Sequence, residues 1–445
     1  MGSILSGPSK QSAHKTVDEP FVKTANKTSV EPVVTTTIDV PLVTAAKKML
    51  DASLVTPTTD TIDVPLVTAA NNKFALDLFK ILYDGNQKEN TFVSPFSISV
   101  ALAMTHLGAR EETAQGMAKA LRWETDDETK LHEQFQAYVT QLQTPNDQYQ
   151  LSTANRIYIE KSYAVLDEFK NKTKKCYLAE TVISNFVSDA ENERLQINSW
   201  VSEQTKNKIN DLLTAGVLGA LTRMVLVNAI YFKGNWDKQF EVENTKPKPF
   251  KVAPGQTKDV PMMTMTHNFP YIVDEELKCT ALEIPYKGRE LGMVIILPDE
   301  DFGLQTLVNS LTSEKLEDLL SQVRGPGEEV SFSFPKFEVT SSFLLKDPLS
   351  KLGMAHAFID SKANFSGISE ENDLDISEVI HKAFVKVNEE GTEAAAATAV
   401  IMMYSRCMPM LPHEVTVDHP FLFVIRDNRA NGNLLFLGQI ADPSS

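Results

Sequence analysis

The segment of residues 389–406 carries the residue types that point most clearly to chemistry. It begins with two glutamates and a glycine, continues with alanines and threonines, and ends in an apolar stretch that contains Tyr404, Ser405 and Arg406 and is followed by Cys407. A connection of this length without structure of its own is usually either functional or disordered. The segment is therefore the first candidate for a functional site.

Side chains alternate in a regular way after position 391. Thr392, Ala394, Ala396 and Thr398 form one alternate set, whose members are all small and uncharged. Because successive side chains of a strand face opposite sides, this set could be buried in a sheet. Glu393 belongs to the other set and can stay on the solvent side, where a charge is tolerated. The alanines favour a helix, but they would also fit between two packed strands.

Metal centres and enzyme active sites leave no signature in this sequence. The eight histidines are dispersed, and Cys176, Cys279 and Cys407 lie too far apart for a disulfide framework or a paired metal motif. The sequence contains no Gly-x-Ser-x-Gly, His-Glu-x-x-His, phosphate-loop or dinucleotide-binding motif. We expect no metal, no cofactor and no catalytic residue.

The elements that must position the segment indicate one large α+β domain, which we place at residues 66–445. Helices are predicted at residues 97–107, 112–121, 128–142 and 195–207. Strands are predicted at residues 224–232, 282–286, 292–297, 329–336, 380–388 and 415–425. Helices that cluster early and strands that cluster late are typical of an α+β fold.

Residues 1–65 form an N-terminal extension that is rich in Thr, Val, Pro and Lys, and we expect it to be disordered. The sequence TIDVPLVTAA occurs at residues 37–46 and again at residues 61–70. The second copy runs into the apolar positions 74–82, which suit an amphipathic helix. We predict that the second copy starts the domain and that the first is a duplication without a structural role.

Several motifs together resemble the serpin family. Residues 389–399 resemble the hinge of the reactive-centre loop of inhibitory serpins. Further matches, in the family's order, are NTFVSPFSIS at 90–99, LVNAIYFKGNW at 226–236, EIPYKG at 283–288, FPKF at 334–337, LSKLGM at 349–354 and DHPFLFVI at 418–425. The resemblance covers the chain from about residue 66. It implies the serpin fold, with helices packed on three β-sheets and an exposed reactive-centre loop.

By resemblance, the chain is an inhibitor that traps a serine protease as a covalent acyl complex. The protease attacks the exposed loop, and the severed loop inserts as a new strand of the main sheet. Within the family, the chain resembles the intracellular branch that includes the leukocyte elastase inhibitor. The alternative is a non-inhibitory serpin that acts as a carrier, a chaperone or a structural protein, in which we would expect bulky, charged or proline residues in the hinge.

The resemblance also assigns roles to individual residues. The hinge comprises Glu389, Glu390, Gly391, Thr392, Glu393, Ala394, Ala395, Ala396, Ala397 and Thr398. The positions that control opening of the main sheet, called the shutter and the breach, are Ser94, Ser97, Asn228, Trp236 and His381. His381 could equally be an ordinary core histidine, but its family position favours a polar latch.

The bond that the protease attacks is predicted to be Arg406-Cys407. Counting forward from Gly391 by the family spacing reaches the Ser405-Arg406 bond, whereas counting back from Asp418 reaches Cys407-Met408. Arg406 lies between the two results, and a trypsin-like protease selects arginine through a buried carboxylate. The bond Tyr404-Ser405, for a chymotrypsin-like protease, is the second choice. Cys407-Met408, for an elastase-like or cysteine protease, is the third.

Charge and targeting signals limit the other partners. The 59 acidic and 43 basic residues give a formal net charge of −16, so we expect no binding to nucleic acid. The acidic residues 123–128 argue against strong heparin binding, and we expect a monomer. The sequence shows no secretory signal, which favours the cytoplasm. Gly2 and Ser6 match the myristoylation pattern, so weak membrane association is one alternative. Unconventional secretion is the other.

Overall fold

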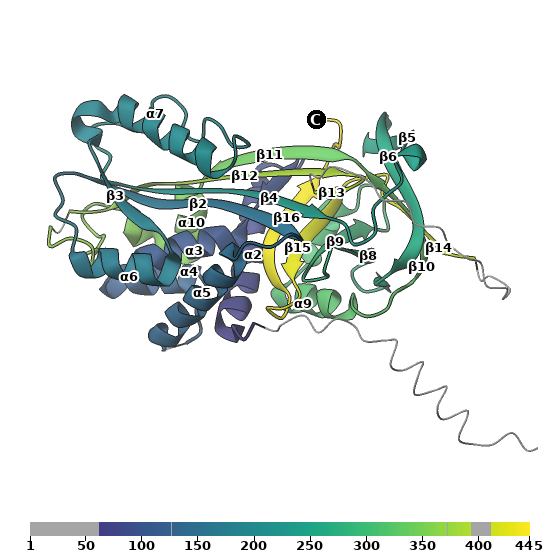
Figure 1. The fold of residues 1–445 in the computed structure, drawn as a ribbon, viewed down its shortest axis with the longest axis horizontal. Coiled ribbons are helices and arrows are strands. Elements are labelled where there is room, and N and C mark those ends of the chain that lie inside the picture. Colours follow the sequence, from purple (N-terminus) through teal and green to yellow (C-terminus); the bar gives the residue numbers. More distant parts are fainter. Residues whose placement is uncertain (1–61, 126, 372, 393–410) are drawn as a thin grey trace, which may run out of the picture. The chain divides into compact units, whose positions relative to one another are not determined.

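Three β-sheets with helices packed against them make up the described part of the chain. The computed structural model describes residues 62–445 except 126, 372 and 393–410 (Figure 1). Two sheets have six strands each and the third has four. The predicted α+β class, with helices packed on three sheets, is confirmed.

The main sheet has the strand order β11-β12-β13-β4-β2-β3. Its strands are β2 (Tyr149–Glu160), β3 (Glu180–Ser184), β4 (Met224–Asn235), β11 (Phe337–Leu344), β12 (Ile376–Asn388) and β13 (Gly391–Thr392). Strands β4 and β12 pair in parallel up to Tyr231 and Phe384. Beyond that point the short strand β13 lies between them and pairs with both.

Strand β4 is apolar along most of its length because both faces of the main sheet are covered. Leu226 and Ile230 belong to the large core cluster that includes helix α3, whereas Val225 and Val227 pack with residues of helix α7. In Figure 1 the helices α3 and α7 accordingly lie on opposite sides of the sheet. A strand that is buried on both faces reads as a continuous apolar run, which made β4 easy to predict.

The other two sheets lie at the end of the main sheet where β13 is found (Figure 1). The six-stranded sheet, in the order β1-β16-β15-β9-β8-β7, contains β1 (Thr91–Val93), β7 (Tyr271–Asp274), β8 (Cys279–Pro285), β9 (Leu291–Pro298), β15 (Phe421–Asp427) and β16 (Asn433–Ile440). The four-stranded sheet, in the order β14-β10-β6-β5, contains β5 (Lys246–Ala253), β6 (Gln256–Phe269), β10 (Glu328–Pro335) and β14 (His413–Thr416).

The described residues form nine helices. They are α2 (Pro65–Gly85), α3 (Pro95–His106), α4 (Glu111–Ala120), α5 (Glu128–Gln143), α6 (Asp167–Tyr177), α7 (Phe186–Gln204), α8 (Leu304–Ser310), α9 (Ser313–Gln322) and α10 (Lys346–Leu349), with short turns η1 (Val242–Asn244), η2 (Ser350–Met354) and η3 (Ala355–Phe358). Four of them, α2, α3, α5 and α9, begin at a proline or at a side-chain cap. The side chain of Asp127 caps α5 and that of Thr312 caps α9. Among the described residues, no helix combines the length and the apolar composition needed to cross a membrane.

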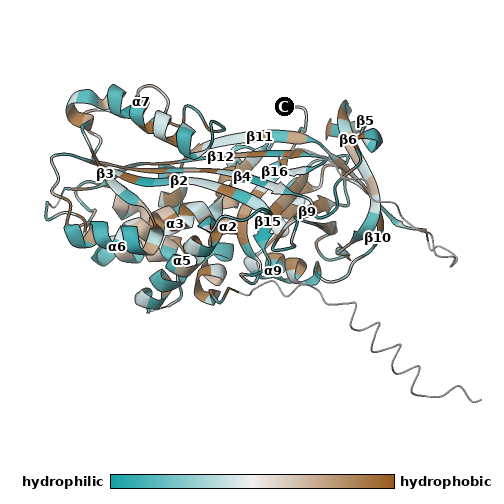
Figure 2. Cartoon of the chain, viewed as in Figure 1, coloured by the Kyte–Doolittle hydropathy of each residue, from teal (hydrophilic) through white to brown (hydrophobic). Residues whose placement is uncertain are grey.

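Hydropathy follows the layers of the fold. Every residue of α3 is buried, in agreement with its position between the main sheet and the other helices. Helix α6 is mostly hydrophilic in Figure 2, and its buried residues Phe169, Thr173 and Tyr177 recur every four positions. This spacing places them on one face of the helix, which packs inward.

Two sequence predictions of elements need correction. The predicted strand 415–425 is wrong as a single element, because β14 belongs to the four-stranded sheet and β15 to a six-stranded sheet. Pro420 lies in the link between them and cannot donate to a ladder, so the chain can leave one sheet and join the other there. The predicted helix 195–207 is the C-terminal part of α7, which begins at Phe186 and is kinked at Asp189.

Residues 62–70 of the second copy of the repeat lie inside the described fold. Val64 and Val67 are buried in the large core, and the amide of Ile62 donates to the carbonyl oxygen of Arg429 at 2.9 Å. The first copy, residues 37–46, lies outside the described residues. The domain boundary at residue 66 stays a prediction.

Candidate functional site

A buried polar cluster lies where β4 and β12 pair. Asn228 and His381 are direct partners in the register of these strands, and neither side chain is exposed. Nδ1 of His381 donates to Oδ1 of Asn228. Its Nε2 accepts a hydrogen bond from the backbone N–H of Ser94 at 3.1 Å. Because one ring nitrogen donates and the other accepts, the imidazole fits this site in its neutral form.

The start of helix α3 connects this cluster to the helical layer. Oγ of Ser94 accepts from the amide of Ser97 at 3.2 Å and donates to the carbonyl oxygen of Leu435 at 2.7 Å. The amide nitrogen Nδ2 of Asn228 lies 3.0 Å from the carbonyl oxygen of Ser97 and 2.6 Å from its Oγ. The cluster therefore ties β4 and β12 to α3 and β16.

Burial lowers the pKa of His381 to about 3. A proton on Nε2 would replace the hydrogen bond from Ser94 by a clash between two donors, in a place where no solvent can reach. The polar contacts of the cluster therefore depend on a neutral ring.

The chain turns at Glu389 and Glu390, directly after β12, and Trp236 holds this turn. The indole Nε1 of Trp236 donates to the carbonyl oxygen of Asn388 at 3.0 Å, and its backbone N–H donates to that of Glu390 at 2.9 Å. Its ring stacks on Tyr286 with 4.7 Å between centroids. Because Trp236 is 2% exposed, the turn is fixed against the core.

The carboxylate of Glu389 is anchored although it is largely buried. It accepts from the hydroxyl of Thr245 at 2.8 Å and forms an ion pair with Nζ of Lys336 at 2.9 Å. Burial alone would raise the pKa of Glu389, but hydrogen bonds, above all the one from Lys336, lower it below its usual value. Glu389 is therefore held as a carboxylate by Lys336, which follows β10, and by Thr245, which precedes β5.

Gly391 and Thr392 form β13, the start of a strand between β4 and β12. Gly391 has a φ of +149°, and a Cβ there would lie 2.1 Å from the carbonyl oxygen of Gly234. Only glycine fits such a close approach of two backbones. Thr392 is fully buried, and its hydroxyl lies 2.9 Å from that of Tyr286.

The sequence model of the family described as "Serpin (serine protease inhibitor)" matches residues 69–443 of this chain. The chain belongs to the serpin family. Since the family is one of serine protease inhibitors, this serpin is classed as an inhibitor and not as an enzyme.

Individual serpins agree with this assignment. The leukocyte elastase inhibitor of Sus scrofa is 45% identical over 378 residues, which cover 84% of this chain and 98% of the relative. Among solved structures, uncleaved ovalbumin is 33% identical with a TM-score of 0.77, and the alignment covers 85% of this chain and all of ovalbumin. Human thyroxine-binding globulin in complex with its ligand is 30% identical with a TM-score of 0.78, over 85% of this chain and 99% of the globulin.

The structure places some of the predicted site residues and not others. One cluster brings together Ser94, Ser97, Asn228 and His381. Trp236 contacts the turn that leads into β13. The hinge residues Glu393, Ala394, Ala395, Ala396, Ala397 and Thr398 lie outside the described residues, as do Tyr404, Ser405, Arg406 and Cys407. The functional roles of all these residues in this serpin stay predictions.

Two residues of the site were missed in the sequence. Asn155 of β2 contacts Nδ2 of Asn228 through its Oδ1, and the same atom lies 3.4 Å from Oγ of Ser97. Tyr286 joins Trp236 to Thr392. Tyr286 belongs to the EIPYKG motif, which was used for the resemblance without a role for its tyrosine. Asn155 gave one weak signal, an amide within the apolar alternation of 151–159.

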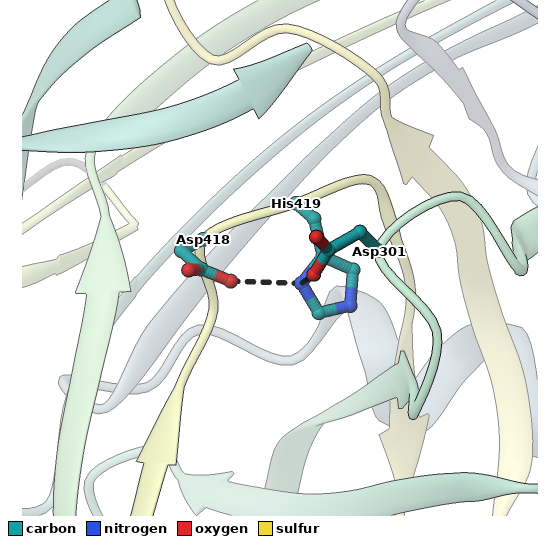
Figure 3. Close-up of side chains that lie close together, drawn as sticks. All are labelled: Asp301, Asp418 and His419. Atoms are coloured by element: carbon teal, nitrogen blue, oxygen red, sulfur yellow. Dashed lines mark hydrogen bonds and ion pairs between the residues drawn. The ribbon is translucent and has the colours of Figure 1, made fainter. Parts of the chain in front are cut away.

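A second cluster of charged residues lies away from the main sheet. Figure 3 shows Asp418 and His419, which follow β14, beside Asp301 from the turn after β9. Nζ of Lys251 forms ion pairs with both carboxylates, at 2.7 Å from an oxygen of Asp301 and at 3.2 Å from an oxygen of Asp418. His419 lies 2.8 Å from Asp418 through Nδ1 and 2.8 Å from the carbonyl oxygen of Pro298 through Nε2. Lys251 thus supplies a cation between the two carboxylates and ties β5 to the link between β14 and β15.

Proposed function

We propose that this serpin traps a serine protease by inserting its cleaved loop between β4 and β12. The observation that carries the proposal is the position of β13. Thr392 pairs with Val387 of β12 and with Gly234 of β4, so the first residues of the loop already occupy the place of a central strand. Continued insertion would extend this strand between β12 and β4.

The free energy for trapping comes from completing the sheet. An inserted strand of about a dozen residues gains hydrogen bonds on both sides, each contributing roughly 0.5–1.5 kcal/mol, besides buried side chains. The total is on the order of 10 kcal/mol, which is released only when the loop is cut. The small residues at 394, 396 and 398 suit the buried side of such a strand.

Insertion must also separate β4 from β12, and this gives the polar cluster its proposed role. The contact of Asn228 with His381 crosses the boundary between the two strands, whereas the contacts of Asn228 with Ser97 stay on one side. The cluster would therefore act as a latch that holds the sheet closed and opens when the loop enters.

Arg406-Cys407 is the proposed reactive bond, with a trypsin-like protease as the target. The guanidinium of arginine is selected by a carboxylate in the specificity pocket of such proteases. An elastase-like protease is the second candidate, because a relative 45% identical to this chain is named leukocyte elastase inhibitor. That protease would cut at Cys407-Met408, whereas a chymotrypsin-like protease would cut at Tyr404-Ser405.

Incubation with trypsin-like, chymotrypsin-like and elastase-like proteases tests the proposal. We expect a complex that survives SDS and a C-terminal peptide that begins at Cys407. Arg406→Ala should abolish trapping of the trypsin-like protease, and Arg406→Lys should retain it. A peptide that begins at Ser405 or Met408 would move the reactive bond, whereas the absence of any SDS-resistant complex would argue against trapping altogether.

A carrier function is the alternative, because the solved structure of thyroxine-binding globulin shares the fold at 30% identity. The small, uncharged residues of the hinge favour the inhibitor.

We also propose a cytoplasmic location. The alternative is weak membrane association through myristoylation of Gly2. Mass spectrometry of the N-terminus distinguishes an acylated Gly2 from a free one.

A further inference from the structure

The exposed face of the four-stranded sheet contains a hollow of about 350 Å³ that the proposed trapping mechanism does not use. We call it the lysine groove, and it is lined by Asn244, Lys246, Lys248, Thr264, Met265 and Thr266. Phe332, Phe334 and Val415 of the same sheet are buried on the opposite face. The groove is therefore the solvent side of a sheet whose other side packs into the core.

Both lysines of the groove lack an acidic partner within the described residues. Nζ of Lys248 contacts two hydroxyls instead, Oγ1 of Thr264 at 3.2 Å and Oγ of Ser333 at 3.1 Å. Lys246 is exposed and forms no ion pair with any described carboxylate. The flanking Glu243 and Glu414 are exposed and pair with neither lysine. In a chain with a net charge of −16, two uncompensated ammonium groups in one hollow favour an anionic partner.

The groove lies within reach of anything bound to the reactive loop. Strand β14 begins at His413, and three strand spacings of about 4.8 Å separate it from β5. Chain length limits Arg406 to about 25 Å from His413, since an extended residue spans at most about 3.5 Å. A protein interface covers about 800 Å² on each partner, so a protease bound to the loop is large enough to reach this sheet.

The edge of the sheet favours contacts through side chains over the addition of a strand. Among the described strands, β5 pairs with β6 alone, and Pro247 and Pro249 leave gaps in its row of N–H groups. Proline at an edge strand prevents another strand from pairing there. The ammonium and hydroxyl groups of the groove remain as the recognition chemistry, and these groups suit carboxylates.

We infer that the lysine groove is a second contact surface for the target protease and selects proteases that carry carboxylates beside the active-site cleft. This inference rests on the proposed trapping function. Opposite charges that face each other mainly accelerate association, and salt weakens the effect. The groove would therefore set the rate of trapping, while the loop sets which bond is cut.

The test compares two variants with the same change in net charge. The double variant Lys246→Glu/Lys248→Glu reverses the charge of the groove. The control, Lys174→Glu/Lys175→Glu, reverses the charge of two exposed lysines of α6 on another part of the surface. Association rates are measured at 20 mM and 500 mM salt for each protease of the panel that the parent traps. We expect the groove variant to trap at least one of them about 10- to 100-fold more slowly at low salt, with little difference at high salt.

The control variant should stay within about threefold of the parent under both conditions. If the two variants trap every protease at equal rates, the groove is not a contact surface for the protease, and the proposed trapping function still stands. If the parent forms no SDS-resistant complex with any protease, the proposed function fails and the groove proposal falls with it. Circular dichroism and the unchanged position of the cleaved bond would show that the groove variant is folded and presents the same loop.

Discussion

The imidazole of His381 accepts one hydrogen bond and donates another inside a cluster that water does not reach. Its pKa of about 3 in the folded protein lies below the value of about 6.5 in an unfolded chain. The neutral His381 therefore makes its full contribution to the free energy of unfolding above about pH 6.5. This contribution is lost progressively as the pH falls toward 3. His132 behaves in the same direction, since burial lowers its pKa to about 4.

We predict that His381→Gln flattens the acid side of the stability profile. Between pH 7 and pH 5 the parent should lose about 2 kcal/mol more unfolding free energy than the variant, because only the parent has this buried histidine to protonate. Urea unfolding at pH 8, 7, 6 and 5 measures the difference. Parallel profiles for the two proteins would mean that His381 binds its proton equally well in both states.

The polar cluster also illustrates what the sequence can reveal at this scale. Ser94, Ser97 and Asn228 were found through motifs with a recognisable local pattern, and His381 was found on the predicted strand that leads into the hinge. Asn155 lies in a half-buried strand with no such motif, and its partner Asn228 is 73 positions away. A contact that depends on the packing of distant strands leaves little trace in the residues on either side.

At the scale of the elements, β13 sets the requirements of the hinge. We predict that Thr392→Arg turns the inhibitor into a substrate, because Thr392 is fully buried between β4 and β12 and faces Tyr286. Burying an uncompensated guanidinium costs several kcal/mol, so insertion slows and the acyl-enzyme hydrolyses first. The loop should be cut without an SDS-resistant complex.

Thr392→Ser is the matched control, since it keeps the hydroxyl that lies near Tyr286. This variant should form as much complex per protease as the parent does. If Thr392→Arg retains the parent's stoichiometry of inhibition, trapping does not require a small, uncharged side chain at position 392.

Fully buried elements could be predicted from the sequence more easily than half-exposed ones. Strand β4 and helix α3 were predicted because burial on all sides leaves a continuous apolar run. Strand β6 was missed because half of its residues are exposed and its apolar signal is mainly methionine. Residues 415–425 were predicted as one strand, because β-branched or aromatic residues lie on both sides of the link between β14 and β15 and only Pro420 marks the change of sheet.

At the scale of the whole molecule, the proposed mechanism requires a native state that is less stable than the cleaved state. We predict that cutting the loop raises the melting temperature by roughly 20 °C, at about 2 °C for each kcal/mol gained in a domain of this size. Calorimetry before and after limited proteolysis with a protease that is not trapped provides the measurement. An unchanged melting temperature would favour the carrier function.

The path of the chain after the loop has a further consequence for any molecule cut between residues 393 and 410. The C-terminal piece contains β14, β15 and β16, and β15 lies in the interior of its sheet between β9 and β16. Arg426 on β15 is fully buried and pairs with Glu283 of β8 at 2.8 Å. A cleaved molecule should therefore elute from a sizing column as one particle, and its two polypeptides should separate only in denaturant. Native chromatography alone thus cannot distinguish an intact molecule from a cleaved one.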